Sequence, residues 1–134
     1  MNKKQAIGYI RDVVSNDRKV TVKYQFDAEN LPAVIRLHGK DGFIDVPLKQ
    51  FKKKVLALKG KEVFTIGRLP LCDIQADHYE DNLISRIHVI WQKKGDKFLL
   101  INCGIFGTTA LAESDNGLQE IPSQEEPWAD FENE

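Results

Sequence analysis

Three short blocks of the sequence adjoin runs of apolar residues, and two of them carry side chains suited to binding an anion. Arg68 directly follows such a run, and an arginine at a strand end offers a planar fork of N–H donors that matches two phosphate oxygens. Ser85 offers a hydroxyl for a third oxygen, and Arg86 beside it adds a positive charge. The third block, residues 102–108, lies between two apolar runs. Because rigid scaffolds commonly present binding groups on loops, these blocks predict one anion-binding site.

The sequence offers little for catalysis. None of the three histidines has a serine or cysteine partner at a recognisable spacing, and no glycine-rich phosphate loop or paired-carboxylate motif is present. The acidic residues Asp77, Glu80 and Asp81 lack the ligand spacing and turn glycine of a calcium loop. Cys72 and Cys103 lack metal-ligand spacing, so we expect buried thiols. We therefore expect a binding protein that is not an enzyme and needs no metal or cofactor.

The amino-terminal segment predicts one helix. Ile7, Ile10, Val13 and Val14 recur at spacings of three and four, which is typical of a short amphipathic helix over residues 3–14. This helix would precede the first strand of the fold.

Strict alternation then predicts a half-buried strand over residues 19–26. Val20, Val22, Tyr24 and Phe26 fall on one face, which we expect to be buried, and polar residues fall on the other. The added segment Met1–Phe26 is a candidate surface for pairing with another chain, through its helix or its exposed strand.

Turn signals rich in glycine, aspartate and asparagine separate the remaining apolar runs. Strands are predicted over residues 33–37, 43–48, 62–66, 84–92, 97–102, 108–112 and 118–121. Residues 49–59 fit either a helix or a strand, and we favour a helical insertion. Many short strands with turns between them predict an all-β sandwich of two antiparallel sheets. The acidic end of the chain, from Pro122 onward, is expected to be a flexible tail.

Taken in order, the blocks resemble the forkhead-associated (FHA) domains over about residues 31–122. They are the hairpin at 33–48, Phe64-Thr65-Ile66-Gly67-Arg68, Cys72-Asp73-Ile74, Ser85-Arg86-Ile87-His88 and Asn102-Cys103-Gly104-Ile105-Phe106-Gly107-Thr108. A Gly-Arg pair alone is not specific, whereas several ordered blocks are. The resemblance implies an FHA-like β-sandwich over 31–122, with a helix-and-strand extension over 1–30 and an acidic flexible tail over 123–134.

By this resemblance the chain binds phosphothreonine on a partner protein in phosphorylation-dependent signalling. The implied phosphate contacts are Arg68, Ser85 and Arg86, the implied peptide contacts are Ile105, Phe106 and Thr108, and the implied structural residues are Gly67, His88 and Gly107. His88 is accordingly expected to be a hydrogen-bonded structural histidine rather than a ligand.

The loop at 102–108 departs from the family's pattern. Phe106 stands where the family has an asparagine that hydrogen-bonds the backbone of the bound peptide, and phenylalanine has no donor or acceptor. Asn102 replaces the usual aspartate, and Gly104 and Ile105 replace polar residues. Either the peptide is read through an aromatic contact, or the chain is a phosphate-independent interaction or assembly domain with a degenerate FHA site.

Ordinary structural explanations also exist for the candidate residues. Arg68 and Arg86 would then be solvated surface arginines, and Ser85 would be a turn serine. The ordered blocks favour phosphate contact for Arg68 and Ser85 and leave Arg86 open. The lysines at 49, 52, 53 and 54 are expected to form a solvated face, or otherwise a patch for nucleic acid or acidic proteins.

Charge along the chain adds a third possible partner. Residues 1–68 hold 15 Lys and Arg against 7 Asp and Glu, whereas residues 69–134 hold 4 against 13. A basic front half attracts phosphate groups in general, and we rank nucleic acid below a phosphothreonine protein. No apolar run approaches the roughly 20 residues that cross a bilayer. We expect a cytoplasmic protein with no membrane partner, and we favour a monomer.

Overall fold

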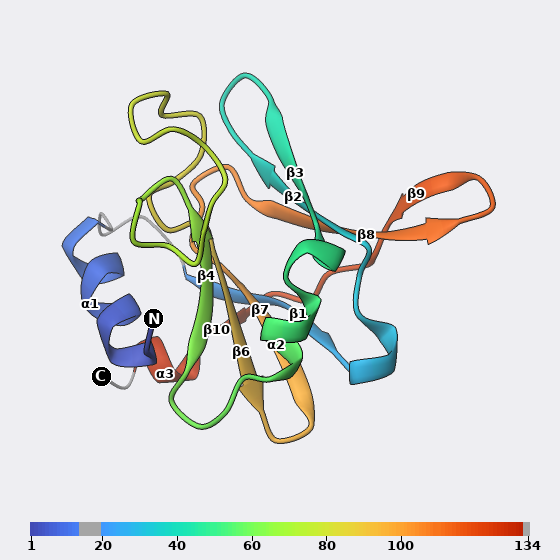
Figure 1. Ribbon diagram of the computed structural model, residues 1–134, viewed down its shortest axis with the longest axis horizontal. Coiled ribbons are helices and arrows are strands. Elements are labelled where there is room, and N and C mark those ends of the chain that lie inside the picture. The colour runs from blue at the N-terminus through green and yellow to red at the C-terminus, as the bar shows by residue number, and fades with distance from the viewer. Residues whose placement is uncertain (14–19, 133–134) are drawn as a thin grey trace.

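Two β-sheets packed on a shared hydrophobic core form the body of the protein, as Figure 1 shows. The structure is a computed structural model and describes residues 1–13 and 20–132. One sheet has six strands in the order β10-β1-β7-β6-β4-β5, and the other has four in the order β3-β2-β8-β9. The predicted all-β sandwich is therefore confirmed.

The elements are short and are joined by tight turns. The six-stranded sheet contains β1 (Thr21–Phe26), β4 (Val63–Gly67), β5 (Ile74–Gln75), β6 (Val89–Lys94), β7 (Lys97–Asn102) and β10 (Glu126–Pro127). The four-stranded sheet contains β2 (Val34–His38), β3 (Phe43–Pro47), β8 (Thr108–Ser114) and β9 (Gly117–Glu120). The helices are α1 (Lys3–Val13), α2 (Lys52–Leu56) and α3 (Ala129–Glu132), with 3₁₀ helices η1 (Ala28–Asn30) and η2 (Leu48–Gln50). The strand pairs are antiparallel apart from β4 and β5, which are parallel.

One hydrophobic core fills the space between the sheets. Ile35, Leu37, Ile66, Trp91 and Leu100 are all completely buried in it. Burial of apolar surface stabilises a fold by roughly 25 cal/mol per Å², so this layer is a main source of stability.

A second core lies on the outer face of the six-stranded sheet. There α1 buries Ala6, Ile7 and Ile10 in one cluster with Val63 and Ile101 of the sheet, and Figure 1 shows the helix alongside β4. The predicted amphipathic helix is confirmed for residues 3–13, and its last predicted residue lies outside the described residues. Both faces of this sheet are therefore covered.

The predicted single buried face of the first strand is wrong, although all four of its apolar residues are buried. The pairing register of β1 with β7 shifts between Val22 and Tyr24, as it does where a β-bulge adds a residue. Val20 and Val22 belong to the outer core with α1, whereas Tyr24 and Phe26 belong to the core between the sheets. Because side chains alternate with a period of two, one added residue moves the following side chains to the other face.

The acidic end of the chain differs from the expected flexible tail. Residues of β10 pair with β1, and Trp128 is only 1% exposed in the outer core. The indole Nε1 donates to Gln92 Oε1 at 2.9 Å, and Gln92 Nε2 donates to Asp130 Oδ2 at 2.6 Å. A buried tryptophan with its N–H satisfied contributes enough apolar burial to order a segment that is otherwise polar.

Two ion pairs join this acidic segment to the basic front of the chain. Lys3 Nζ lies 3.6 Å from Asp130 Oδ2, and Lys23 Nζ lies 3.6 Å from Glu125 Oε1. The carboxylates near the end of the chain thus lie against lysines of α1 and β1.

The insertion at 49–59 is helical, as predicted, and contains most of η2 and all of α2. Both cysteines are buried free thiols, which was also predicted. Residues 84–88, predicted as the start of a strand, form an irregular segment, and β6 begins only at Val89. Three backbone bonds join this segment to 66–69, including His88 N to Ile66 O at 2.9 Å, and His88 O accepts from Cys103 N at 2.8 Å.

The amino-terminal strand is not an exposed edge. β1 is paired with β7 along one side and with β10 at Thr21 and Val22 on the other, and Ala6, Ile7 and Ile10 of α1 are buried. Part of the assembly surface that the sequence suggested for residues 1–26 is therefore occupied within the chain. Among the described residues, no helix is long and apolar enough to span a bilayer.

Candidate anion-binding site

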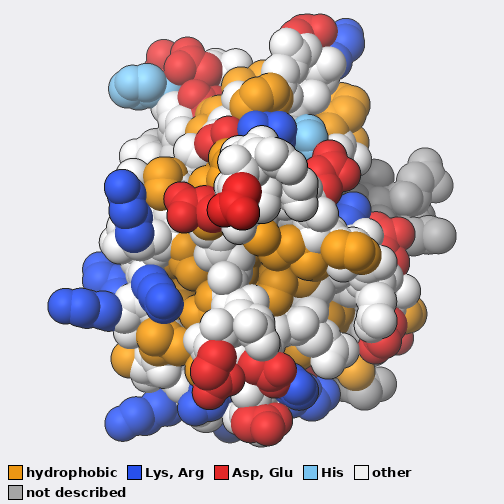
Figure 2. Space-filling model, turned by 90° about the vertical axis from the view of Figure 1, so that its right-hand side faces the viewer, with side chains coloured by type: hydrophobic (Ala, Val, Ile, Leu, Met, Phe, Trp, Pro, Cys, Tyr) orange, Lys and Arg blue, Asp and Glu red, His pale blue; other side chains and the backbone are white. Residues whose placement is uncertain are grey.

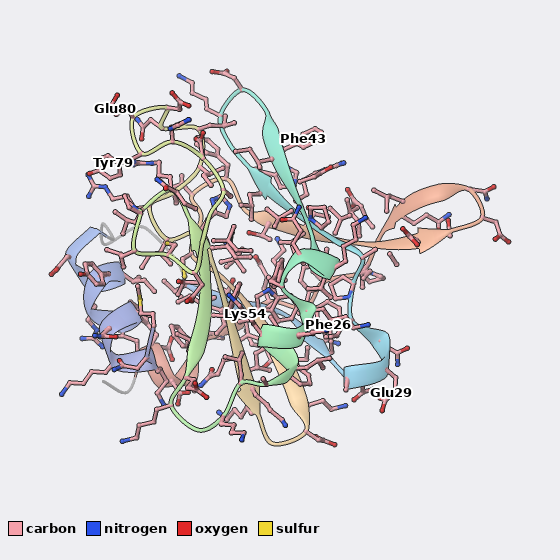
Figure 3. The ribbon with its side chains drawn as sticks, in the orientation of Figure 1. Phe26, Glu29, Phe43, Lys54, Tyr79 and Glu80 are labelled. Atoms are coloured by element: carbon pink, nitrogen blue, oxygen red, sulfur yellow. The ribbon has the colours of Figure 1, made fainter. Side chains whose placement is uncertain are left out.

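Three loop regions meet at one end of the sandwich. They are the β2–β3 turn (39–42), the segment between β4 and β6 (68–88) and the β7–β8 loop (103–107). In Figure 3, Tyr79 and Glu80 of the second region and Phe43 beside the first lie at this end of the molecule. A cavity of about 430 Å³ lies between them, lined by His38, Lys40, Arg68, Asn82, Leu83, Ile84, Ser85, Arg86, Ile105 and Phe106.

Arg68 is held by backbone carbonyls rather than by carboxylates. Its Nε donates to Ile84 O at 2.9 Å, and its Nη1 donates to Tyr79 O at 2.8 Å. The Tyr79 ring centroid lies 5.0 Å from the guanidinium carbon, and Arg68 is 9% exposed. Within the described chain it forms no ion pair, so its positive charge is not neutralised. The remaining Nη2 donors are available to an anion in the cavity that Arg68 lines.

Gly67 sets the position of this arginine. A Cβ on Gly67 would lie 2.1 Å from the carbonyl oxygen of Arg86, which is closer than atoms can approach. The close approach lets Arg68 N donate to Ser85 O at 3.3 Å and Leu69 N donate to Arg86 O at 3.1 Å. The end of β4 and the segment carrying Ser85 are thereby placed side by side, which explains how the first two predicted blocks come together.

Ser85 and His88 join the second block to the third. Ser85 Oγ accepts a hydrogen bond from Ile105 N at 3.2 Å, which leaves the hydroxyl hydrogen to be donated elsewhere. His88 Nδ1 accepts from Ser85 N at 3.1 Å, so its proton sits on Nε2, which donates to Gly107 O at 2.8 Å. His88 is completely buried and does not line the cavity. Its position is that of a structural residue.

Buried polar groups also brace the β7–β8 loop. The Asn102 side chain accepts from Gly104 N and donates to Gly104 O, each at 3.1 Å. A Cβ on Gly104 would lie 2.2 Å from His88 Nε2, so only glycine fits beneath the imidazole ring. Gly107 has a φ of +92°, a left-handed conformation that favours glycine. The loop is therefore fixed in place before any ligand binds.

The predicted peptide-contacting residues divide into two groups. Ile105 and Phe106 line the cavity and are 68% and 53% exposed. Thr108 does not line it: the residue is 1% exposed, and its hydroxyl donates to Asn102 Oδ1 at 2.8 Å. The prediction for Thr108 is therefore not supported, because its side chain points into the structure and supports the loop.

The lining charges favour an anion. Lys40, Arg68 and Arg86 line the cavity, and no Asp or Glu does. The pKa of His38 is lowered, first by burial of its ring and then by the positive charges of Arg36 and Lys23, so this fourth lining group is mostly neutral near pH 7. A cavity with three cations and no carboxylate attracts a multiply charged anion such as a phosphate group.

Three residues that shape this site were not predicted from the sequence. His38 ends β2 and Lys40 lies in the β2–β3 turn, and only the packing of the sandwich brings both to the cavity. Tyr79 positions Arg68 through its carbonyl and ring. A lysine in a predicted turn could have pointed to Lys40. The role of Tyr79 depends on its backbone carbonyl, which every residue has, so the sequence does not reveal it.

Comparison of the chain with protein-family models, with characterised proteins and with solved structures found no match in any of the three.

Proposed function

We propose that this protein is a phosphopeptide-binding module of the FHA type, which binds phosphothreonine on a partner protein. The observation that carries the proposal is the arrangement of Arg68. Two backbone carbonyls and an aromatic ring fix its guanidinium at the wall of a cavity that two more cations line and no carboxylate does.

The roles of the residues follow from their donors. Arg68 Nη2 and the Ser85 hydroxyl donate to the phosphate oxygens, and Arg86 and Lys40 add positive charge at the rim. Charge-assisted hydrogen bonds contribute roughly 1.5–3 kcal/mol each. Three or four of them, less the cost of ordering the peptide, match the roughly 8 kcal/mol of micromolar binding. The chemistry is recognition, with no bond made or broken.

The peptide around the phosphothreonine contacts Ile105 and Phe106. Both side chains are exposed, yet the loop that carries them is fixed by Ser85, Asn102 and His88. A preorganised loop loses little entropy on binding, so it offers a firm apolar surface beside the phosphate. This contact takes the place of the hydrogen bond that an asparagine makes in the FHA domains that the chain resembles.

The test begins with a screen of an oriented library of phosphothreonine peptides. Calorimetry then measures the affinity of the protein for the best peptide and for the same peptide without the phosphate. The expected result is micromolar binding of the phosphopeptide and at least tenfold weaker binding of the unphosphorylated peptide. Arg68→Ala should abolish binding. Equal affinity of Arg68→Ala and the parent for the phosphopeptide would refute the assignment.

A second candidate function is phosphate-independent protein binding. The exposure of Ile105 and Phe106 favours it, because these apolar side chains can bind a partner without any phosphate. It predicts that the phosphorylated and unphosphorylated peptides bind equally well and that Phe106→Ala weakens both.

A further inference from the structure

The β8–β9 hairpin projects from the body of the molecule (Figure 1). Residues 113–120 are all exposed, and Leu118 is 44% exposed. β9 is an edge strand of its sheet and contains neither lysine nor proline, which commonly protect such edges. A two-stranded hairpin by itself is only marginally stable in water. This hairpin therefore has the properties of an element that packs against something else.

A groove of about 880 Å³ lies at the base of this hairpin, at the other end of β2 from the anion-binding cavity. Its apolar lining includes Leu31, Pro32, Val34, Leu48, Leu118 and Ile121. The walls are fixed within the chain, since Ala33 N donates to Leu111 O at 2.8 Å and Leu48 N donates to Ala33 O at 2.9 Å. The groove is thus already formed in the single chain.

The hairpin is acidic, and one wall of the groove is basic. Residues 113–120 contain three carboxylates and no lysine or arginine. Lys49 and Lys52 line one wall of the groove, and two more lysines follow on α2. Glu29 and the hairpin's own Glu113 line the groove elsewhere. None of the four lysines forms an ion pair within the described part of the chain. Figure 2 views the molecule from the side of the hairpin and shows a central hydrophobic area with Lys and Arg side chains along one flank.

We propose that the β8–β9 hairpin of one copy of this chain binds in the groove of a second copy, and that the second copy receives the first hairpin in the same way. An interface with twofold symmetry uses the same patch on both copies, so that patch must carry its own complement. This one does, because an acidic hairpin with an exposed leucine adjoins an apolar groove with a basic wall. The inference departs from the monomer that the sequence favoured.

The proposed interface leaves the anion-binding cavity open. Val34 at one end of β2 lines the groove and His38 at the other end lines the cavity, and the two lining sets share no residue. We expect a weak and concentration-dependent dimer rather than an obligate one. The proposal does not depend on the proposed phosphopeptide binding.

Charge exchange between two variants tests the proposal with the full 134-residue chain. The first variant is Lys49→Glu with Lys52→Glu, and the second is Glu113→Lys with Asp115→Lys. All four side chains are exposed, so both variants should fold, which circular dichroism checks. Sedimentation velocity over a range of concentrations should show a dimer for the parent and at least tenfold weaker self-association for each variant alone.

Mixing the two variants supplies the decisive measurement. In the mixture each acidic hairpin meets lysines and each lysine hairpin meets glutamates, so the mixed dimer should form about as well as the parent dimer. The control is Lys59→Glu with Lys61→Glu, which makes the same change in net charge at exposed positions outside the groove and should leave the dimer intact. A parent that stays monomeric up to millimolar concentration, a dimer that survives in each variant, or a mixture that fails to associate would each overturn the proposal.

Discussion

Tyr79 holds Arg68 in two ways, through its carbonyl oxygen 2.8 Å from Nη1 and through its ring centroid 5.0 Å from the guanidinium carbon. Residue 79 lies eleven positions further along the chain, in the irregular segment between β5 and β6. The segment and the arginine therefore fix each other, and the direction of the remaining N–H donors depends on that segment.

Arg68→Lys should reduce the affinity for a phosphothreonine peptide by at least about tenfold, although the charge is kept. A lysine carries all its donors on one nitrogen, so it cannot bond two separated carbonyls and a phosphate as the arginine fork does. Calorimetry measures the affinity, and hydrogen exchange should show faster exchange over residues 77–83. Arg36→Lys is the matched control, since Arg36 pairs with Asp45 and does not line the cavity. Unchanged affinity in Arg68→Lys would contradict the fork geometry.

Gly104→Ala should lower the free energy of unfolding by about 1–3 kcal/mol, the usual cost of forcing an extra atom into a packed site. The new Cβ would lie 2.2 Å from His88 Nε2, and displacing that ring breaks its bonds to Ser85 and Gly107. Urea unfolding measures the change. Gly42→Ala, where nothing lies within 4 Å of the added atom, should be close to neutral. Equal free energies of unfolding for the two variants would contradict the close contact between Gly104 and the His88 ring.

Trp128→Ala should lower the free energy of unfolding by about 3–5 kcal/mol, as large-to-small changes of buried aromatic residues do. The side chain is 1% exposed between α1 and the six-stranded sheet. Trp128→Phe keeps most of the apolar burial and loses only the Nε1 bond to Gln92, so it should cost less. If the end of the chain were a dispensable tail, both variants would unfold at the parent's urea concentration.

Asp130 should make stability depend on pH on the acid side. Its pKa is lowered mainly by the hydrogen bond from Gln92, and further by the charge of Lys3, against the opposing effect of burial. A carboxyl whose pKa is lower in the folded chain contributes stability above its unfolded pKa, and that contribution is lost as the pH falls through the folded pKa. Asp130→Asn should therefore be less stable than the parent from pH 7 to pH 5, with the difference shrinking below about pH 4. Urea unfolding at these pH values measures the difference, and Glu113→Gln, at an exposed position on the hairpin, is the matched control.

Much of the fold was predictable because strands and turns leave local signals. Alternating apolar residues and turn glycines gave the hairpins, and the five lining residues Arg68, Ser85, Arg86, Ile105 and Phe106 were all identified as candidates before the structure placed them at one cavity. These residues follow or precede strands, and the ends of packed strands bring their loops together.

The remaining features depend on contacts distant in the sequence. The register shift at Val22 and Tyr24 is decided by pairing with β7, which an alternating pattern does not reveal. Trp128 is one apolar residue in an acidic segment, so composition predicted a flexible tail although the side chain fills a buried site. The hydroxyl of Thr108 could also bind a peptide. Only the structure shows that this hydroxyl donates to Asn102 Oδ1 within the chain.

The ion pairs of Lys3 with Asp130 and of Lys23 with Glu125 change what an approaching molecule encounters. Folding brings the acidic half of the chain onto part of the basic half, so these lysines contribute little to the long-range field of the protein. Positive potential is then concentrated at sites such as the cavity, where Lys40, Arg68 and Arg86 have no carboxylate beside them among the lining residues. A dianion is steered by that local potential, and its association rate should fall as ionic strength screens it.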